Sequence, residues 1–137
     1  MSKSFDEIRL VRAAQAAAKK AYAPYSCFHV GAAVLSDSGK IYLGANIENA
    51  SYGLTVCAER VAIFRAVIEG ASKIKAIAIV TPDAIEKSPC GACLQVISEF
   101  AAPETKIYLA NPSGNRALSR AFAEFLPHPF HFPFKKR

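Results

Sequence analysis

Residues 28–45 read FHVGAAVLSDSGKIYLGA, and they set the pattern for the rest of the chain. A short apolar run over residues 28–35 ends at the polar, glycine-containing segment 36–39, which is typical of a turn. A second apolar run follows over residues 41–45. We therefore predict two β-strands joined by a turn.

One helix is predicted before this pair of strands in the sequence, and another after it. Apolar residues recur at helical spacing from residue 5 to about residue 21, and Pro24 prevents the helix from continuing. After the strands, residues 46–53 are polar without a sustained period, so we expect a loop there. Residues 56–69 are again helical, with apolar side chains around most of the circumference, so this helix should be buried on several sides.

The second half of the chain alternates strands and helices. We predict strands at 75–80 and 106–110, a helix from near Pro89 to about residue 100, and a final helix over 117–126 that can follow a very short fifth strand. The fold class is therefore α/β, a three-layer α/β/α sandwich. Its mixed sheet should have about five strands, helices on both faces, and parallel strands wherever a helix intervenes.

Length and composition describe one folded domain over residues 1–137. The 52% of hydrophobic residues excludes disorder caused by low hydrophobicity. No run approaches the roughly 18 apolar residues of a membrane span, and the first residues lack the apolar centre of a secretory signal. We expect a cytoplasmic protein with no membrane partner. The net charge of +6 permits an anionic partner, but many cations lie on the first helix and at the C-terminus, so we interpret them as solvated surface.

The cysteines are spaced as metal ligands. In a reducing cytosol, thiols or metal ligation are favoured over disulfides. Cys57 and Cys90 open two predicted helices, where the helix dipole stabilises a thiolate, and Cys93 shares one helix face with Cys90. With Cys57 as a third sulfur, a tetrahedral zinc ion keeps an open fourth position, which is the catalytic pattern. If Cys27 were a fourth ligand the site would be closed, but we interpret Cys27 as a buried free thiol.

Glu59 gives this cluster a proton acceptor. It follows Cys57 by two residues, close enough to take a proton from water at the open position without binding the metal. A cysteine or histidine ligand, a nearby glutamate that is not a ligand, and a downstream P-C-x-x-C motif are the pattern of zinc deaminases. The pair Cys90 and Cys93 alone would also fit a redox dithiol or half of a structural zinc ribbon.

Four segments together resemble the small homotetrameric cytidine deaminases, and the resemblance extends over nearly the whole chain. They are PYSCFHVGAA at 24–33, GANIENASY at 44–52, TVCAER at 55–60 and PCGAC at 89–93. The resemblance implies zinc-dependent hydrolytic deamination of cytidine and 2'-deoxycytidine to uridine and 2'-deoxyuridine with release of ammonia, in pyrimidine salvage. It also implies a homotetramer.

The resemblance assigns roles to individual residues. One zinc ion per subunit would be held by three cysteines, and Glu59 would shuttle protons. Arg60 would donate hydrogen bonds to the ligand sulfurs. The zinc ligands and the substrate-binding residues are, in turn, Cys57, Cys90 and Cys93, then Phe28 beside the pyrimidine, Ala58 at the base through its backbone, Asn46 and Glu48 at the ribose hydroxyls, and Tyr25, Tyr52 and Phe130 as walls supplied between subunits.

Leu94 is a departure from these relatives, which commonly have arginine after the second cysteine of the pair. It removes a cation from the neighbourhood of the site. The C-terminal part of the chain is rich in phenylalanine, which predicts more apolar surface than a small monomer exposes, and an oligomer interface would explain it. The residues concerned are Phe122, Phe125, Phe130, Phe132 and Phe134.

Two other functions fit part of the pattern. One is a deaminase acting on bases in nucleic acid, which the net charge permits, and the other is a zinc module that binds nucleic acid without catalysis. A carboxylate such as Glu48 suits a free sugar and would repel a phosphate-linked strand. Cysteine rather than histidine as the first ligand also favours the nucleoside enzymes. We therefore expect cytidine and deoxycytidine as ligands and no nucleic-acid partner.

Overall fold

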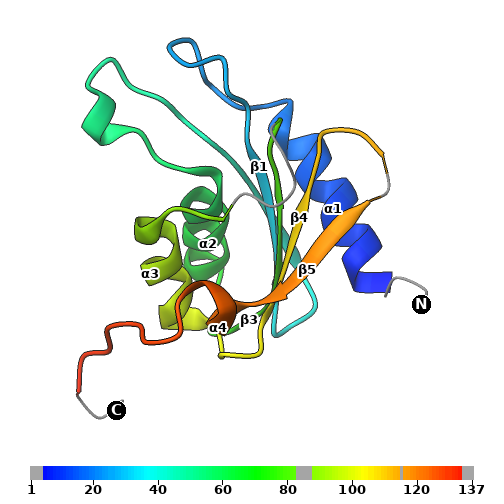
Figure 1. Ribbon diagram of the computed structural model, residues 1–137, viewed down its shortest axis with the longest axis vertical. Helices are drawn as coiled ribbons and strands as arrows, with labels where there is room; N and C mark the ends of the chain where they lie inside the picture. Colours follow the sequence, from blue (N-terminus) through cyan, green and yellow to red (C-terminus); the bar gives the residue numbers. More distant parts are fainter. Residues whose placement is uncertain (1–4, 83–87, 115, 134–137) are drawn as a thin grey trace.

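The structure is built on one five-stranded mixed sheet (Figure 1). The computed structural model describes residues 5–82, 88–114 and 116–133. The strand order is β2-β1-β3-β4-β5, and of the neighbouring pairs β3 and β4 are parallel while the other three are antiparallel. The bounds are β1 (Gly31–Ser36), β2 (Ile41–Ala45), β3 (Ile74–Val80), β4 (Lys106–Ala110) and β5 (Ala117–Ala121).

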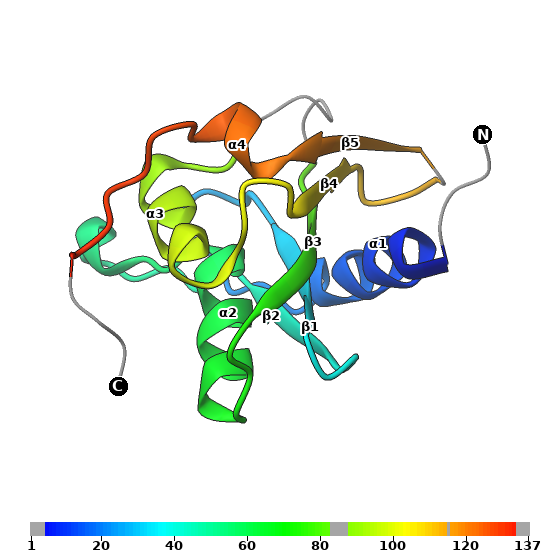
Figure 2. The same ribbon diagram turned by 90° about the horizontal axis from the view of Figure 1, so that it is seen from below.

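Helices cover both faces of the sheet, which confirms the predicted α/β/α sandwich. One face carries α1 (Phe5–Ala18), and the other carries α2 (Ala58–Ile68) and α3 (Gly91–Phe100) (Figures 1 and 2). Side chains of β1 alternate between the two layers, as the pleat of a strand requires. Ala32 and Val34 belong to the core under α2 and α3, whereas Ala33 and Leu35 belong to the core under α1.

Two glycines let the helices approach the sheet closely. A Cβ atom on Gly31 would lie 2.0 Å from the carbonyl oxygen of Ala14 in α1. A Cβ atom on Gly44 would lie 2.4 Å from the carbonyl oxygen of Ala58 and 2.4 Å from the amide nitrogen of Ala62, both in α2. These obstacles are backbone atoms, which cannot rotate away, so a side chain at either position would displace a helix.

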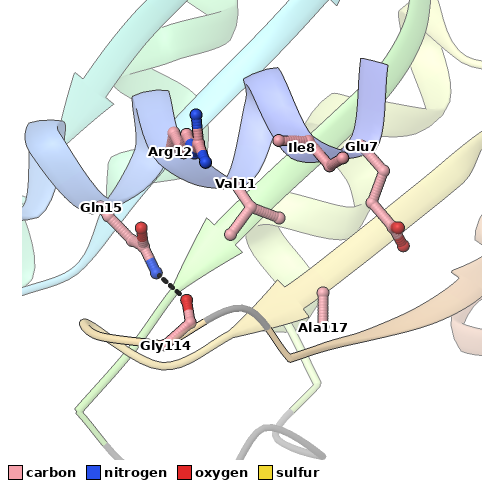
Figure 3. Close-up of a pocket in the computed structure, with 7 residues that line it drawn as sticks. All are labelled: Glu7, Ile8, Val11, Arg12, Gln15, Gly114 and Ala117. Carbon is pink, nitrogen blue, oxygen red and sulfur yellow. Dashed lines mark hydrogen bonds between the residues drawn. The ribbon is translucent and has the colours of Figure 1, made fainter. Parts of the chain in front are cut away.

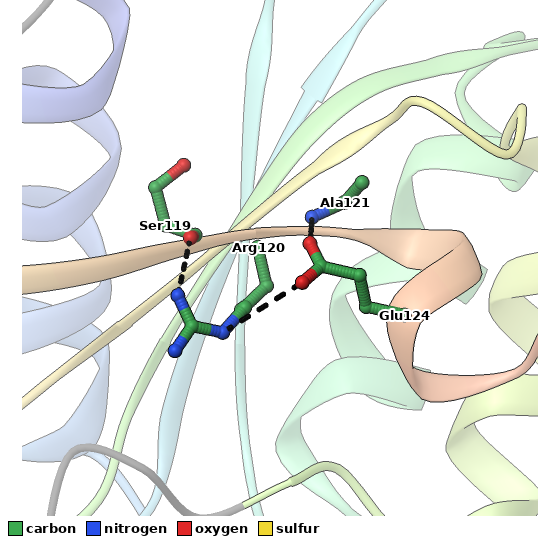
Figure 4. A network of polar contacts seen from close by, with 4 residues as sticks. All are labelled: Ser119, Arg120, Ala121 and Glu124. Carbon is green, nitrogen blue, oxygen red and sulfur yellow. Dashed lines mark hydrogen bonds and ion pairs between the residues drawn. The ribbon is translucent and has the colours of Figure 1, made fainter.

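The C-terminal part differs from the prediction. Residues 117–121 form a full strand, and the helix predicted over 117–126 is reduced to α4 (Phe122–Phe125). Every residue of β5 pairs with β4, and this ladder outweighs the local preference for helix. At the junction, Glu124 Oε2 accepts a hydrogen bond from the Ala121 amide at 2.7 Å, and Arg120 Nε lies 4.0 Å from Glu124 Oε1 (Figure 4).

The predicted exposure of the phenylalanines is partly wrong. Phe122 is buried in the core under α2 and α3, and Phe125 packs against it, because α4 turns these rings inward. Phe130 and Phe132 are exposed, each at 68% of its surface. Phe134 lies outside the described residues.

The first helix is also tied to the far edge of the sheet. Gln15 in α1 donates from Nε2 to the carbonyl oxygen of Gly114 at 3.0 Å (Figure 3). It also donates to the carbonyl oxygen of Asn111 at 3.2 Å, and both acceptors lie in the connection between β4 and β5. A groove of about 280 Å³ runs along this contact, with Val11 and Ala117 in its wall. None of the helices in the described ranges combines the length and apolar character that crossing a membrane requires.

We predict that Gly44→Ala lowers the free energy of unfolding by about 1–3 kcal/mol, because the added methyl group overlaps the α2 backbone. Urea denaturation measures the change. The matched control is Gly53→Ala, where nothing lies within 4 Å of the added carbon, and it should stay within about 0.5 kcal/mol of the parent. Equal effects at the two positions would contradict the packing argument.

Candidate metal centre and adjoining pockets

Strand direction brings two helix N-termini to the same edge of the sheet. Because β2 and β3 are each antiparallel to β1, they run in the same direction, and their C-terminal ends share an edge. The chain leaves β2 to begin α2 at Ala58 and leaves β3 to begin α3 at Gly91, with both helices on the same face. Ligand sites in open α/β sheets commonly occupy this edge.

The three cysteines lie at these helix starts. Cys57 is the N-cap of α2, Cys90 is the N-cap of α3, and Cys93 lies in the first turn of α3. Their sulfur atoms all lie within 4.8 Å of one another, and the sulfurs of Cys57 and Cys90 are 3.9 Å apart. The Cys93 amide donates to Cys90 Sγ at 3.3 Å, so the side chain of Cys90 caps the start of α3.

This donor set fits zinc. Tetrahedral Zn²⁺ with Zn–S bonds of about 2.3 Å places its sulfur ligands about 3.8 Å apart, close to the distance between Cys57 and Cys90. Over the described part of the chain, no further His, Cys, Asp or Glu joins the three, and no second group of this kind occurs. The set therefore leaves a fourth coordination position free.

Cys27 lies outside this cluster. The prediction that it is buried is wrong: it is an exposed free thiol, with a φ of 57° in the segment between α1 and β1. It lines a pocket with Lys19 and His29, which does not include any of the three clustered cysteines. The Cys₄ alternative finds no fourth sulfur in the fold, because this segment turns Cys27 toward the end of α1.

Arg60 adds positive charge beside the sulfurs. Its Nη2 lies 3.6 Å from Cys57 Sγ and donates to it. Hydrogen bonds from Cys93 and then from Arg60 lower the pKa of Cys57 to about 5, and the bond with Cys57 also raises the pKa of Arg60. The pKa of Cys93 is raised, mainly because its thiol shares a hydrogen bond with Cys57 and is buried.

Glu59 is the buried carboxyl group of the site. Only 5% of its surface is exposed, although it lies in the first turn of α2. Burial raises its pKa, and the negative charge of Cys57 raises it further. A carboxyl group with a raised pKa next to a metal-binding cluster is suited to accept and release protons.

A pocket of about 230 Å³ opens beside the cysteines. It is smaller than the roughly 300–1,000 Å³ of sites for drug-sized ligands, so it fits one heteroaromatic ring rather than a whole nucleotide. Its walls come from the segment before β1, the loop after β2, the start of α2, the end of β3 and the start of α3. Six of the site residues predicted from the sequence line this pocket: Phe28, Asn46, Cys57, Ala58, Glu59 and Cys90.

Asn46 holds part of this pocket together. Its Oδ1 accepts from the Val30 amide and its Nδ2 donates to the Phe28 carbonyl, both at 2.8 Å. The side chain is buried, and both ends of its amide bind backbone groups. Asn46 therefore fixes the segment that carries Phe28 against the loop after β2.

Glu48 lies in a neighbouring pocket of about 290 Å³ instead. This pocket is lined by Tyr25, Ser26, Glu48, Tyr52 and Thr55. The rings of Tyr25 and Tyr52 meet edge to face, with centroids 5.9 Å apart. Thr55 lines both pockets, so the two cavities adjoin.

Phe130 does not line the pocket at the cysteines, and position 94 carries no positive charge. The ring of Phe130 is exposed, and its carbonyl oxygen accepts from Gln95 Nε2 at 3.0 Å. It lines neither of the two pockets. Leu94 is buried in the core under α2 and α3, so a cation is missing at this position and Arg60 supplies the positive charge at the sulfurs.

Sequence reasoning missed several pocket residues. Thr55, Thr81, Ser88 and Pro89 line the pocket at the cysteines, and Ser26 lines the neighbouring one. Thr55 and Pro89 are the first residues of the motifs TVCAER and PCGAC, which was an available signal. No sequence signal pointed to Thr81, because it lines the pocket only where the fold brings the end of β3 next to the start of α3.

Comparisons with known proteins agree with this geometry. Residues 5–109 match the family model of the cytidine and deoxycytidylate deaminase zinc-binding region. A cytidine deaminase of Halalkalibacterium halodurans is 47% identical over 125 residues, covering 91% of this chain and 94% of that protein. One of Sporosarcina psychrophila is 45% identical, covering 91% of each. The crystal structure of cytidine deaminase from Burkholderia pseudomallei has a TM-score of 0.84 at 42% identity, covering 93% of this chain and 100% of that one.

We predict that Cys90→Ala lowers bound zinc to below about a tenth of the content of the parent protein, because two sulfurs seldom hold zinc alone. Metal analysis of the purified protein measures this. Cys27→Ala is the matched control and should keep full zinc content, since Cys27 is exposed and outside the cluster. Loss of zinc from the control would support a closed four-sulfur site.

Proposed function

This chain belongs to the cytidine deaminase family of zinc-binding enzymes, and from that membership we propose that it hydrolyses cytidine and 2'-deoxycytidine to uridine and 2'-deoxyuridine, releasing ammonia. The observation that carries the proposal is the buried Glu59 beside three clustered sulfurs, at a pocket sized for one ring. A catalytic domain spanning residues 1–137 would serve pyrimidine salvage.

Cys57, Cys90 and Cys93 would hold one zinc ion per subunit. When bound, zinc supplies a Lewis acid and lowers the pKa of a water ligand to about 7. The three thiolates together carry more negative charge than the ion neutralises. Arg60 offsets that excess through its hydrogen bond to Cys57 Sγ, at 3.6 Å.

Glu59 would move the protons of the reaction. Its raised pKa allows the carboxylate to take a proton from the attacking water and pass it to the pyrimidine ring. The water oxygen bonds to C4, and the hydroxyl formed there gives its proton to Glu59. As the C4–N bond breaks and the C4 carbonyl forms, Glu59 delivers this second proton to the departing amino group, which leaves as ammonia. Burial keeps the carboxyl group away from bulk water during these transfers.

The pocket residues would orient the nucleoside. Phe28 offers a ring for the pyrimidine to stack against, and the backbone of Ala58 lies at the start of α2, where amide groups are free to bind the base. Asn46 lines the same pocket, and Glu48 lines the next one. We assign the ribose hydroxyls to Asn46 and Glu48, with the sugar near Thr55, where the two pockets adjoin.

We further propose a homotetramer in the cytoplasm. Exposed apolar side chains gather on the outer face of α2, on η1 (Tyr52–Leu54) and on the C-terminal segment, which runs past α3 in both views (Figures 1 and 2). Apolar surface of this extent supports association. Tyr25, Tyr52 and Phe130 would then wall the site of a neighbouring subunit. Four free cysteines suit a reducing compartment.

The oligomer is tested by light scattering on the purified protein. We expect a mass about four times the 14.7 kDa of one chain, because association would bury exposed rings such as those of Tyr52 and Phe130. The mass of a single chain would contradict the shared site.

The activity is tested by the change in ultraviolet absorbance of cytidine, 2'-deoxycytidine, CMP and a cytosine-containing oligonucleotide. We expect turnover of the two nucleosides with release of ammonia. The oligonucleotide and CMP should not react, because the ionised Glu48 disfavours phosphate at the sugar pocket. Turnover of the oligonucleotide alone would support a nucleic-acid deaminase.

Glu59→Gln is the control for this assay. The amide fills the same space but cannot carry the protons, so turnover should fall by about 10²–10⁴-fold. Zinc content should stay unchanged, since Glu59 is not one of the three clustered groups. Retained activity would remove Glu59 from the mechanism.

A further inference from the structure

Ser26 connects the two pockets through its hydroxyl group. The Ser26 Oγ–H donates to Glu48 Oε2, and the same oxygen accepts a hydrogen bond from the Phe28 amide at 3.0 Å. Glu48 Oε1 also accepts from the amides of Tyr25 and Ser26, at 2.9 and 3.1 Å. One serine thus links the residue at the cysteine pocket to the carboxylate of the neighbouring pocket.

These contacts hold Glu48 in one orientation. A carboxylate has about four acceptor positions, and three are taken by the Tyr25–Ser26 segment, so about one stays open to a ligand. The hydrogen bond from Ser26 is the largest cause of the lowered pKa of Glu48, which stays ionised. Without the hydroxyl, Glu48 would keep the two amide bonds to Oε1, but Oε2 would lose the only hydrogen bond that it makes within the described part of the chain.

Asn46 fixes the other side of the same segment. Its amide group binds the backbone on both sides of His29, at Phe28 and Val30. The segment that carries Phe28 is therefore held at two points by polar side chains. The Ser26 hydroxyl is the side-chain group that joins the Glu48 carboxylate to the Phe28 amide.

We propose that Ser26 is a positioning residue for the sugar: it sets the distance between Phe28 and Glu48 so that a ribose hydroxyl reaches the open position of Glu48 when the pyrimidine lies against Phe28. This rests on the proposed function. Ser26 acts through Glu48 rather than on the reacting atoms, and the pyrimidine chemistry at Glu59 does not depend on it.

The test compares Ser26→Ala with the parent on two ligands. We expect the KM for cytidine to rise about tenfold, the lower end of the value of a hydrogen bond to a charged group, with kcat within about twofold. The inhibition constant of 2',3'-dideoxycytidine, which lacks the ribose hydroxyls concerned, should change less than about twofold. Ser26→Thr, which keeps the hydroxyl, should restore most of the affinity for cytidine.

Ser72→Ala is the matched control. The Ser72 hydroxyl donates to Asp37 Oδ2 at 2.9 Å, a serine-to-carboxylate bond of the same kind between the β1–β2 turn and the start of β3. It lines neither substrate pocket, so its loss should leave both constants unchanged. In a Glu48→Ala background, Ser26→Ala should add less than about twofold, because the two residues act as one unit.

The outcomes are distinct. Equal weakening of cytidine and of the dideoxy analogue would overturn the proposal, since Ser26 would then support the pocket as a whole. Unchanged constants would also overturn it, as would a full additional loss in the Glu48→Ala background. Failure of the proposed function itself is visible separately, as absence of cytidine turnover by the parent protein.

Discussion

The common direction of β2 and β3 is the constraint on which the functional site depends. Each strand is antiparallel to β1, which lies between them, so both end at the same edge of the sheet. The helices that follow them begin there and pack on the same face. Gly44 lets α2 lie against β2 with backbone contact, and the start of α2 is therefore held in place by packing.

Electrostatics at this edge follows from the same arrangement. The N-termini of α2 and α3 favour negative charge, and the side chains of Cys57 and Cys90 lie at these two N-termini. Arg60 contributes a positive charge one helical turn after Cys57. Glu59 is turned into the interior and its pKa is raised, whereas Glu48 lies in a solvent-facing pocket and its pKa is lowered. Two carboxyl groups in one site thus differ because their surroundings differ.

Local sequence patterns predicted much of the fold. They failed where pairing between distant segments decides whether a segment is helix or strand. The turn at residues 36–39, the helices α1, α2 and α3, and the strands β2, β3 and β4 lie close to their predicted positions. The first half of the helix predicted over 117–126 is the strand β5, since β4 offers a ladder that a local pattern cannot reveal. Phe122 entered the core for the same reason. The expected burial of Cys27 was wrong because the segment between α1 and β1 turns Cys27 toward the end of α1, where it is exposed.

The sequence by itself determined the chemistry: which residues are thiols, which carboxylate adjoins them, and that Cys57 and Cys90 begin helices. Spacing within one helix is local geometry, so Cys90 and Cys93 could be placed together from the sequence. Only the tertiary structure decided that Cys57, 33 residues away, has its sulfur 3.9 Å from Cys90. It also decided that Phe28 and Glu48 face different pockets joined by Ser26. Distances of this kind are set by sheet pairing and helix packing, which depend on contacts between segments far apart in the chain.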